Sequence, residues 1–239
     1  MEEKLSGIVI GGVSFGENDR IINVFTLEKG VVSAKIKGVK KAGAKLKFAA
    51  EPFCFAEFVF SKTQEKRTVI GASLIDSFYP VREDIKKYFA AGAVLEFIKR
   101  FYKESMVDTD EFFLCINALK EIAYGDNPLS KLVAFLVSAL KNVGYNLTLS
   151  GCFKCEENID GRVFFDYRTG AFLCEECFDG DGREINLITL KALILAKNGE
   201  LTDKDEGAVK ALKLLEYYIL NGAEEKISSI GELISLCER

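Results

Sequence analysis

The sequence of 239 residues contains no histidine, no tryptophan and only three prolines. Without an imidazole, a Ser-His-Asp or Cys-His catalytic apparatus and a histidine-ligated metal are excluded. No apolar run is long enough to span a bilayer, and the N-terminus, Met1-Glu2-Glu3-Lys4, lacks the basic start and apolar stretch of a signal peptide. We therefore expect a cytoplasmic protein that does not associate with a membrane.

The composition is that of a globular protein, with 49% hydrophobic and 28% charged residues and a formal net charge of −4. A negative total, taken alone, argues against a nucleic-acid partner. However, residues 1–80 carry 12 Lys and Arg against 9 Asp and Glu, or +3, whereas residues 81–239 carry 20 against 27, or −7. The total therefore hides a basic N-terminal part and an acidic C-terminal part.

Residues 1–80 are predicted to form a five-stranded barrel. The β-rich runs are bounded by Gly, Asn, Asp or polar turns. The third run alternates between apolar and polar residues, as expected for a strand with one buried face. Five such strands can close a small barrel of the OB type. The runs are Leu5–Val13, Arg20–Leu27, Val31–Lys37, Pro52–Ser61 and Lys66–Ser73.

Residues 81–239 are predicted to form an α-helical domain, which makes the fold class α+β. Apolar residues recur at helical spacing, which is typical of core packing in a bundle. Asn127 fits an N-cap with Pro128 as the first helical residue, and Gly144 fits the C-terminal stop of the same helix. The other helices are expected near Arg82–Lys103, Asp110–Tyr124, Leu187–Lys197, Asp205–Leu220 and Glu225–Cys237.

A block of lysines lies at the end of the third run and in the loop after it. Six lysines fall within thirteen residues that contain no acidic residue. Lysine ammonium groups bind phosphates without reading bases, so we expect sequence-tolerant, salt-dependent contact with a nucleic-acid backbone. The alternative interpretation is a flexible, solvated loop. The lysines are Lys35, Lys37, Lys40, Lys41, Lys45 and Lys47.

Three phenylalanines lie near this block in the sequence: Phe15, Phe25 and Phe48. A phenylalanine can stack on a base, but in a small barrel it is more typical of the core. We therefore expect these residues to belong mainly to the barrel interior.

Four of the seven cysteines form two C-x-x-C pairs separated by eighteen residues: Cys152, Cys155, Cys174 and Cys177. This spacing is typical of a four-cysteine zinc site, because a hairpin brings two thiolate pairs together as edges of a tetrahedron. Iron or a redox disulfide pair are the alternatives. Four thiolates leave no open coordination position, so we expect one structural Zn²⁺ in an inserted module at 150–180. The stretch between the pairs is predicted to be a β-hairpin, and Cys54, Cys115 and Cys237 are interpreted as small buried residues.

The sequence offers no active site. Gly11 and Gly16 have the spacing of phosphate-loop glycines, but Glu17-Asn18 stands where Lys and Ser/Thr would be required. Adjacent acidic pairs do not converge on one site by themselves, and no third carboxylate stands out to complete a two-metal centre. We therefore expect a protein that is not an enzyme. A metal-dependent nuclease and a zinc-containing protein adaptor without direct DNA function remain as alternatives.

Several short motifs, taken in order and spacing, resemble the bacterial RecO recombination mediators from end to end. They are Gly16-Glu17-Asn18-Asp19-Arg20-Ile21, Phe25-Thr26 with Gly30, Lys37-Gly38, Pro52-Phe53 and Phe78-Tyr79-Pro80-Val81-Arg82. Gly144-Tyr145 and Thr169-Gly170, ahead of the two cysteine pairs, resemble the family's zinc region. One departure is that the family's basic loop is usually Arg-rich and closes with a Gly, whereas this loop is all lysine with Ala49-Ala50-Glu51 before Pro52. The departure implies weaker or more salt-sensitive DNA binding.

The resemblance implies an OB-fold DNA-binding domain at 1–80 and a helical domain at 81–239 with a zinc-binding insertion. It implies a DNA repair and recombination mediator that binds single- and double-stranded DNA and anneals complementary strands. With RecR, such a protein promotes loading of the RecA recombinase onto DNA coated by single-stranded DNA-binding protein, and it joins the nucleoid during repair. The residues expected to contact DNA are Arg20, Lys35, Lys37, Lys40, Lys41, Lys45 and Lys47, and those expected to bind zinc are Cys152, Cys155, Cys174 and Cys177.

Overall fold

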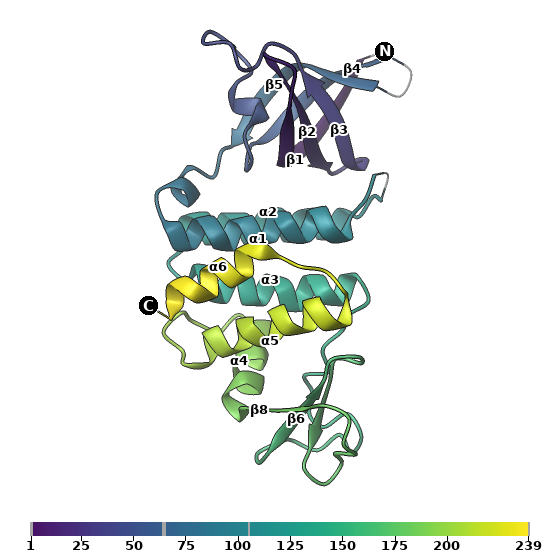
Figure 1. Cartoon of the computed structure of the whole chain (residues 1–239), viewed down its shortest axis with the longest axis vertical. Helices are drawn as coiled ribbons and strands as arrows, with labels where there is room; N and C mark the ends of the chain where they lie inside the picture. Colours follow the sequence, from purple (N-terminus) through teal and green to yellow (C-terminus); the bar gives the residue numbers. More distant parts are fainter. Residues whose placement is uncertain (1, 64–65, 105, 239) are drawn as a thin grey trace. The chain divides into compact units, whose positions relative to one another are not determined.

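The computed structural model describes residues 2–63, 66–104 and 106–238, and it has the α+β fold that the sequence predicts (Figure 1). The chain divides into two compact units. The first comprises residues 1–82 and 95–116, and the second comprises residues 83–94 and 117–239. The end of helix α1 (Ile85–Phe101) and the start of helix α2 (Thr109–Tyr124), which form a helical hairpin, therefore belong with the strands, and the other helical residues form the second unit.

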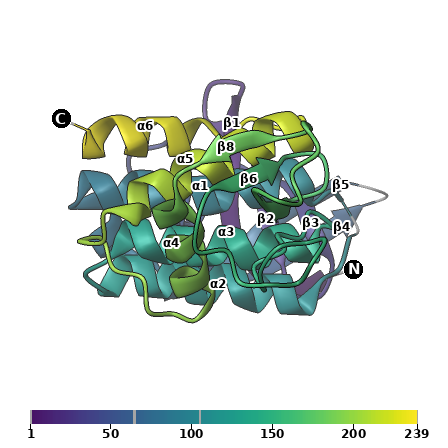
Figure 2. The same ribbon diagram turned by 90° about the horizontal axis from the view of Figure 1, so that it is seen from below.

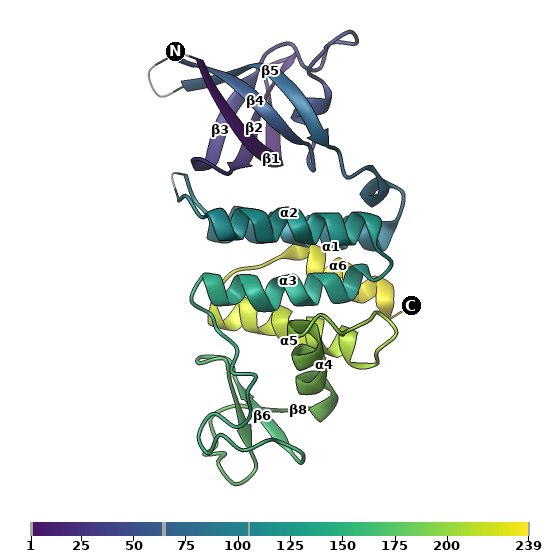
Figure 3. The same ribbon diagram turned by 180° about the vertical axis from the view of Figure 1, so that it is seen from behind.

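The N-terminal strands close into a five-stranded barrel, which confirms the prediction. The strand order is β1-β2-β3-β5-β4, with β4 returning to pair with β1, and only β3 and β5 are parallel neighbours (Figures 1 and 3). The strands are β1 (Glu2–Phe15), β2 (Asp19–Thr26), β3 (Gly30–Ile36), β4 (Phe55–Thr63) and β5 (Lys66–Asp76). Each lies within a few residues of its expected run.

Strand β1 is long enough to serve both of its neighbours in the barrel. Its first half, residues 2–8, pairs with β4, and its second half, residues 7–15, pairs with β2. A bulge between Val9 and Gly11 shifts the register at the point where the strand changes partner. A bulge increases local twist and bends a strand, which is what closing a small barrel requires.

The barrel core follows from the alternation of the strands. Val32, Ala34 and Ile36 of β3 are fully buried, whereas Ser33 and Lys37 between and after them are exposed. Successive side chains of a strand point to opposite faces, so the apolar set fills the interior and the polar set faces outward. Buried residues of the other four strands and of the loop before β4 complete the core, which includes the stacked rings of Phe58 and Phe60.

Part of the helical hairpin covers the outside of the barrel within the first unit. The ring of Phe25 lies 5.6 Å, centroid to centroid, from both Tyr102 and Phe112. Gly30 forms a β-bridge with Glu104, and its φ of +64° and the closeness of the Met106 backbone leave no room for a side chain. These contacts explain why residues 95–116 group with the strands.

The helices of the second unit pack α3 against α4 and α5, and α5 against α6. Their bounds agree with the expected helices to within three residues at each end. The helices of the described chain are α1 (Ile85–Phe101), α2 (Thr109–Tyr124), α3 (Pro128–Asn142), α4 (Leu187–Lys197), α5 (Gly207–Gly222) and α6 (Ser228–Cys237), with α1 and α2 divided between the two units. None of the helices among the described residues is both long and apolar enough to cross a membrane.

The start of α3 differs from the expectation in how it is capped. Asn127 occupies the N-cap position and Pro128 begins the helix, but the Asn127 side chain makes no capping hydrogen bond. Instead the Asp203 carboxylate accepts hydrogen bonds from the backbone N–H groups of Leu129 (3.1 Å) and Ser130 (2.7 Å), and Asn127 Oδ1 accepts one from the Asp203 N–H (3.2 Å). A distant segment therefore satisfies the orphan donors that the first turn of a helix leaves.

A small three-stranded sheet of order β7-β6-β8 is inserted between α3 and α4 (Figure 2). The hairpin of β6 (Val163–Asp166) and β7 (Ala171–Cys174) confirms the predicted one, whereas the third strand, β8 (Arg183–Ile185), was not expected. The sheet is attached to α5 by the ring of Phe165, whose centroid lies 5.4 Å from that of Tyr218. Its hairpin turn also accepts a backbone hydrogen bond at Gly170 O from Thr148 N (3.0 Å).

Candidate nucleic-acid interface and metal centre

The basic block lies where the alternation of β3 and the following loop place it. Lys35 and Lys37 point outward from the end of β3, and the loop from Gly38 to Lys47 is a series of turns that stands out from the barrel (Figures 1 and 3). Backbone hydrogen bonds close these turns, from Lys41 N to Gly38 O and from Ala44 N to Lys41 O. The loop is thus a folded surface that carries its lysines outward.

The loop is joined to the turn between β1 and β2. The Asp19 carboxylate accepts hydrogen bonds from Gly38 N (2.7 Å) and from the ammonium group of Lys35 (2.8 Å). These two contacts lower the pKa of Asp19, the Lys35 hydrogen bond having the larger effect. Lys40 N also donates to Asn18 O at 3.0 Å. The β1–β2 turn and the basic loop therefore form one continuous edge of the barrel.

The seven residues predicted to contact DNA divide into two groups. Arg20 and Lys35 are partly buried and paired with carboxylates, Arg20 with Glu51 at 3.4 Å and Lys35 with Asp19. The other five are exposed and have no carboxylate oxygen within 4.0 Å among the described parts of the chain: Lys37, Lys40, Lys41, Lys45 and Lys47. These five lysine side chains are therefore open to solvent.

The three phenylalanines near the block have different positions. Phe25 is fully buried, and Phe48 packs against the barrel core. Phe15 is 48% exposed at the end of β1, and the Lys35 Nζ atom lies 4.4 Å from the centroid of its ring. Phe25 is buried as expected, but it packs on Tyr102 and Phe112 and not inside the barrel, whereas Phe48 does pack against the barrel core. For Phe15 the expectation of a core position is wrong, because Phe15 falls on the outward face of its strand next to the turn.

Sequence reasoning missed three residues of β5 on this surface, Lys66, Arg67 and Thr68. Lys66 and Thr68 of β5 line the same groove as Lys35, since β5 is the parallel neighbour of β3 and Thr68 is paired with Lys35. The outward alternation of β5 was readable in the sequence, but its place beside β3 follows only from barrel closure.

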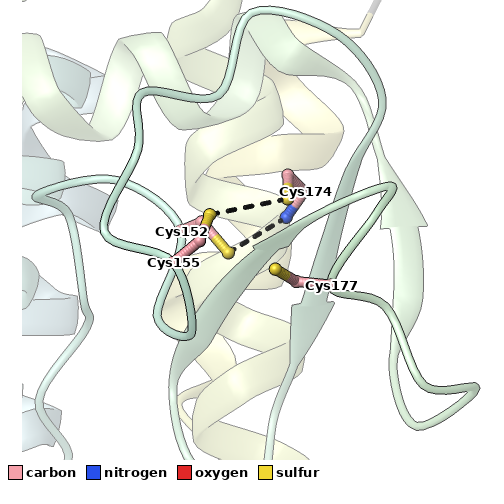
Figure 4. Close-up of side chains that lie close together, drawn as sticks. All are labelled: Cys152, Cys155, Cys174 and Cys177. Atoms are coloured by element: carbon pink, nitrogen blue, oxygen red, sulfur yellow. Dashed lines mark hydrogen bonds between the residues drawn. The ribbon is translucent and has the colours of Figure 1, made fainter.

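The two cysteine pairs meet in the inserted sheet. All four Sγ atoms lie within 4.8 Å of one another, and the Cys155 and Cys174 sulfurs are 3.9 Å apart (Figure 4). Cys152 is buried, Cys174 and Cys177 are half-buried and Cys155 is exposed. The predicted set is therefore brought together, whereas Cys54, Cys115 and Cys237 lie elsewhere, with Cys237 only half-buried.

Backbone geometry prepares each pair to present its thiolates. Residue Gly151, just ahead of the first pair, has a φ of +140°, and an added Cβ there would lie 2.7 Å from the Glu157 carbonyl oxygen. That closeness allows Cys152 N to donate to Glu157 O at 2.9 Å, which folds the first pair into a tight turn. Cys174 N points at the Cys152 sulfur from 3.5 Å (Figure 4). The two pairs are thus connected by the Cys174 N–H group.

The thiols differ in how readily they ionise. Burial opposes ionisation of Cys152, but N–H groups of Cys155, Cys174 and Lys154 outweigh burial and lower the pKa of Cys152 to about 6. Hydrogen bonds with the Cys174 and Cys155 side chains raise the pKa of Cys177 to about 12. One thiolate therefore forms readily, whereas four together repel one another unless a cation lies between them. The donor set fits a thiophilic metal such as Zn²⁺ or iron.

The core that the cysteines themselves belong to is small. Its own cluster of buried residues consists of Cys152, Phe164 and Leu173. The rings of Phe164 and Phe178 stack at 3.9 Å, and Lys154 links the two pairs by donating to Cys177 O (3.1 Å) and Asp179 Oδ2 (2.6 Å). So small a core is typical of a module that a metal stabilises.

The fold and these two sites define a class of protein: an OB-type barrel with an exposed basic loop, followed by a helical domain that carries a four-cysteine metal module. Family models agree with this description. The model of the recombination protein O N-terminal domain matches residues 1–78, and that of its C-terminal domain matches residues 82–229.

Curated relatives extend over nearly the whole chain. The DNA repair protein RecO of Acetivibrio thermocellus is 31% identical over 237 residues, which cover 96% of this chain and 88% of that protein. The DNA repair protein RecO of Bacillus subtilis is 26% identical over 228 residues, with 91% and 88% covered. That of Caldicellulosiruptor saccharolyticus is 28% identical over 194 residues, with 81% and 80% covered. The chain belongs to the RecO family of DNA repair proteins.

Proposed function

We propose that this protein is a non-enzymatic recombination mediator that binds single- and double-stranded DNA through the basic edge of its barrel. The observation that carries the proposal is the end of β3 and the loop after it, where five lysines are exposed with no carboxylate oxygen of the described residues within 4.0 Å. Family membership supports the same role, since the relatives are named DNA repair proteins.

The chemistry of the loop favours contact with the DNA backbone. Each ammonium group is a point charge that neutralises one phosphate and releases a condensed counterion. Arg20 and Lys35 contribute by exchanging their carboxylate partners for phosphates. Binding of this kind tolerates any sequence and accepts both single strands and duplexes.

Annealing of complementary strands follows from the same surface. Two strands repel each other through their phosphates, and a positively charged edge offsets this repulsion while the bases remain free to pair. No bond has to be broken, so no catalytic group is required.

We further propose that residues 81–239 serve protein partners, as residues 1–80 serve DNA. The acidic charge of the second part suits contact with proteins rather than with DNA. Its partners are RecR, single-stranded DNA-binding protein and, indirectly, the RecA filament that the mediator helps to load. Because its proposed substrate is chromosomal DNA, we propose that the protein lies in the cytoplasm and associates with the nucleoid during repair.

The metal in the module at residues 150–180 is proposed to be one structural Zn²⁺ held by Cys152, Cys155, Cys174 and Cys177. A tetrahedral set of four thiolates suits zinc and leaves no position for a reacting water. The metal therefore stabilises the fold of the module and supplies no chemistry.

The proposal is tested by annealing and binding assays on a fourfold variant of the basic loop, in which Lys40, Lys41, Lys45 and Lys47 are replaced by Ala. We expect slower annealing and weaker binding of both single strands and duplexes. A matched control removes four exposed lysines from the helices, by replacing Lys99, Lys120, Lys141 and Lys191 with Ala, and should anneal and bind as the wild type.

Two outcomes would contradict the proposal. If the loop variant and the control bind DNA equally, the loop serves solubility and the adaptor alternative is favoured. If the purified protein cuts DNA when Mg²⁺ is added, and one acidic substitution abolishes the cutting, the nuclease alternative is correct.

A further inference from the structure

A second surface of the barrel lies beside the basic loop and has a different character. It is a groove of about 570 Å³ on the outer face of the strands. Its lining combines an aromatic ring, aliphatic side chains and cations, and the described residues of the lining include no carboxylate. The residues that the argument uses are Phe15, Ile21, Lys35, Lys37, Lys66 and Thr68.

Phe15 is held at this groove by its neighbours. It is paired with Asp19 across the β1–β2 hairpin, which places its ring outward, and it remains 48% exposed. The Lys35 ammonium lies 4.4 Å from the ring centroid and is fixed there by the Asp19 carboxylate at 2.8 Å. The ring is therefore oriented by an ammonium group on one face, and about half of the side chain stays open to solvent.

The combination of an exposed ring and adjacent cations fits one kind of ligand. An unpaired base offers a π-face to the ring, while its phosphates meet the ammonium groups of Lys35, Lys37 and Lys66. A duplex cannot use the ring in this way, since its bases stack on one another. The groove is also continuous with the basic loop, because Asp19 contacts both Lys35 and Gly38.

We propose that this groove is a subsite for single-stranded DNA in which Phe15 stacks on an unpaired base. The inference rests on the proposed DNA-binding function and assigns different contacts to the loop and to the groove. The loop lysines hold phosphates of any DNA, and Phe15 adds affinity for single strands alone.

The first test compares Phe15→Ala with the wild type on an oligothymidylate and on a duplex of the same length. Loss of one stacked base should weaken single-strand binding on the order of 10-fold. Duplex binding and the salt dependence of both should stay unchanged, because no charge is removed. Val13→Ala shortens another exposed apolar side chain of β1 and should bind both DNAs as the wild type. Phe15→Tyr should retain single-strand affinity.

The second test uses the absence of tryptophan from the chain. Phe15→Trp introduces a single indole, whose fluorescence should be quenched when oligothymidylate binds and should change little with a duplex. The control is Tyr124→Trp, at an exposed position on α2, whose fluorescence should change with neither oligothymidylate nor duplex. This variant keeps an aromatic ring at position 15, so it remains informative if Phe15→Ala folds poorly.

The outcomes separate this inference from the proposed function. If the wild type binds neither DNA, the proposed function itself is wrong. Two results with a wild type that binds both DNAs would show that only the stacking subsite is wrong. One is that Phe15→Ala weakens the binding of single strands and duplexes equally, or of neither. The other is that single strands leave the indole fluorescence of Phe15→Trp unchanged.

Discussion

The cap of α3 by Asp203 predicts a measurable loss of stability in Asp203→Ala. This substitution removes the acceptors of the Leu129 and Ser130 N–H groups, at 3.1 and 2.7 Å. Both residues are buried, so water does not replace the carboxylate easily. The helix start would also lose a negative charge that its dipole favours.

The expected magnitude follows from the two lost hydrogen bonds. Removal of an N-cap acceptor costs about 1–2 kcal/mol. For a chain of this size, each kcal/mol lowers Tm by roughly 2–4 °C, so Asp203→Ala should melt roughly 2–8 °C below the wild type. Asp203→Asn keeps one carbonyl oxygen but no charge, so its Tm should lie between those of the wild type and Asp203→Ala. Thermal unfolding followed by circular dichroism gives all three values.

Asp126→Ala is the matched control for this prediction. Asp126 is an exposed carboxylate just ahead of the same helix, and it makes none of the capping hydrogen bonds. Its removal should leave Tm nearly unchanged. The reasoning is refuted if Asp203→Ala melts with the wild type, or if Asp126→Ala costs as much.

Three further predictions concern the metal module and one half-buried acid, Glu216. Native protein should contain about one zinc per chain, and Cys152→Ser should lose the metal and become protease-sensitive at 150–180, whereas Cys237→Ser should retain it; a stable metal-free preparation would contradict this. Gly151→Ala should weaken metal retention because of its φ of +140° and the carbonyl 2.7 Å away, while Gly161→Ala, in open space, should not; equal retention in elemental analysis would refute the strain argument. Burial raises the pKa of Glu216, so the folded state keeps a proton that the unfolded state releases, and stability falls as pH rises from the ordinary glutamate pKa through the raised one. The difference in Tm between Glu216→Gln and the wild type should therefore be more in favour of the variant at about pH 8 than at about pH 4. A Tm difference that does not change with pH would exclude this linkage.

Features that depend on neighbouring residues in the chain could be predicted from the sequence. Alternation in β3 placed Val32 and Ile36 inside and Lys37 outside, as the structure has them. The two cysteine pairs could be assigned to one site because their spacing suits a hairpin, and β6 and β7 form that hairpin. These predictions depended on the alternation of residues along one strand and on the spacing of cysteines within one short segment.

Features that depend on distant pairing could not be predicted. The sequence shows no link between Asp203 and the start of α3, which lies more than 70 residues earlier. Strand β8 has only three residues, too few for an alternation to be recognised. The partners of Lys35 and Arg20, and the exposed ring of Phe15, follow from barrel closure and from turn geometry. Part of the surface that we propose to bind DNA is therefore known only from the fold.

The central claim is that the loop lysines bind DNA phosphates, and the salt dependence of DNA affinity tests it most directly. Each phosphate contact contributes about 0.9 to the slope of log K against log salt for a duplex and about 0.7 for a single strand. Replacing Lys40, Lys41, Lys45 and Lys47 by Ala should therefore flatten the slope by up to about 3.6 for a duplex and about 2.8 for a single strand. The control that replaces Lys99, Lys120, Lys141 and Lys191 should keep the wild-type slope. An unchanged slope in the loop variant would contradict the account.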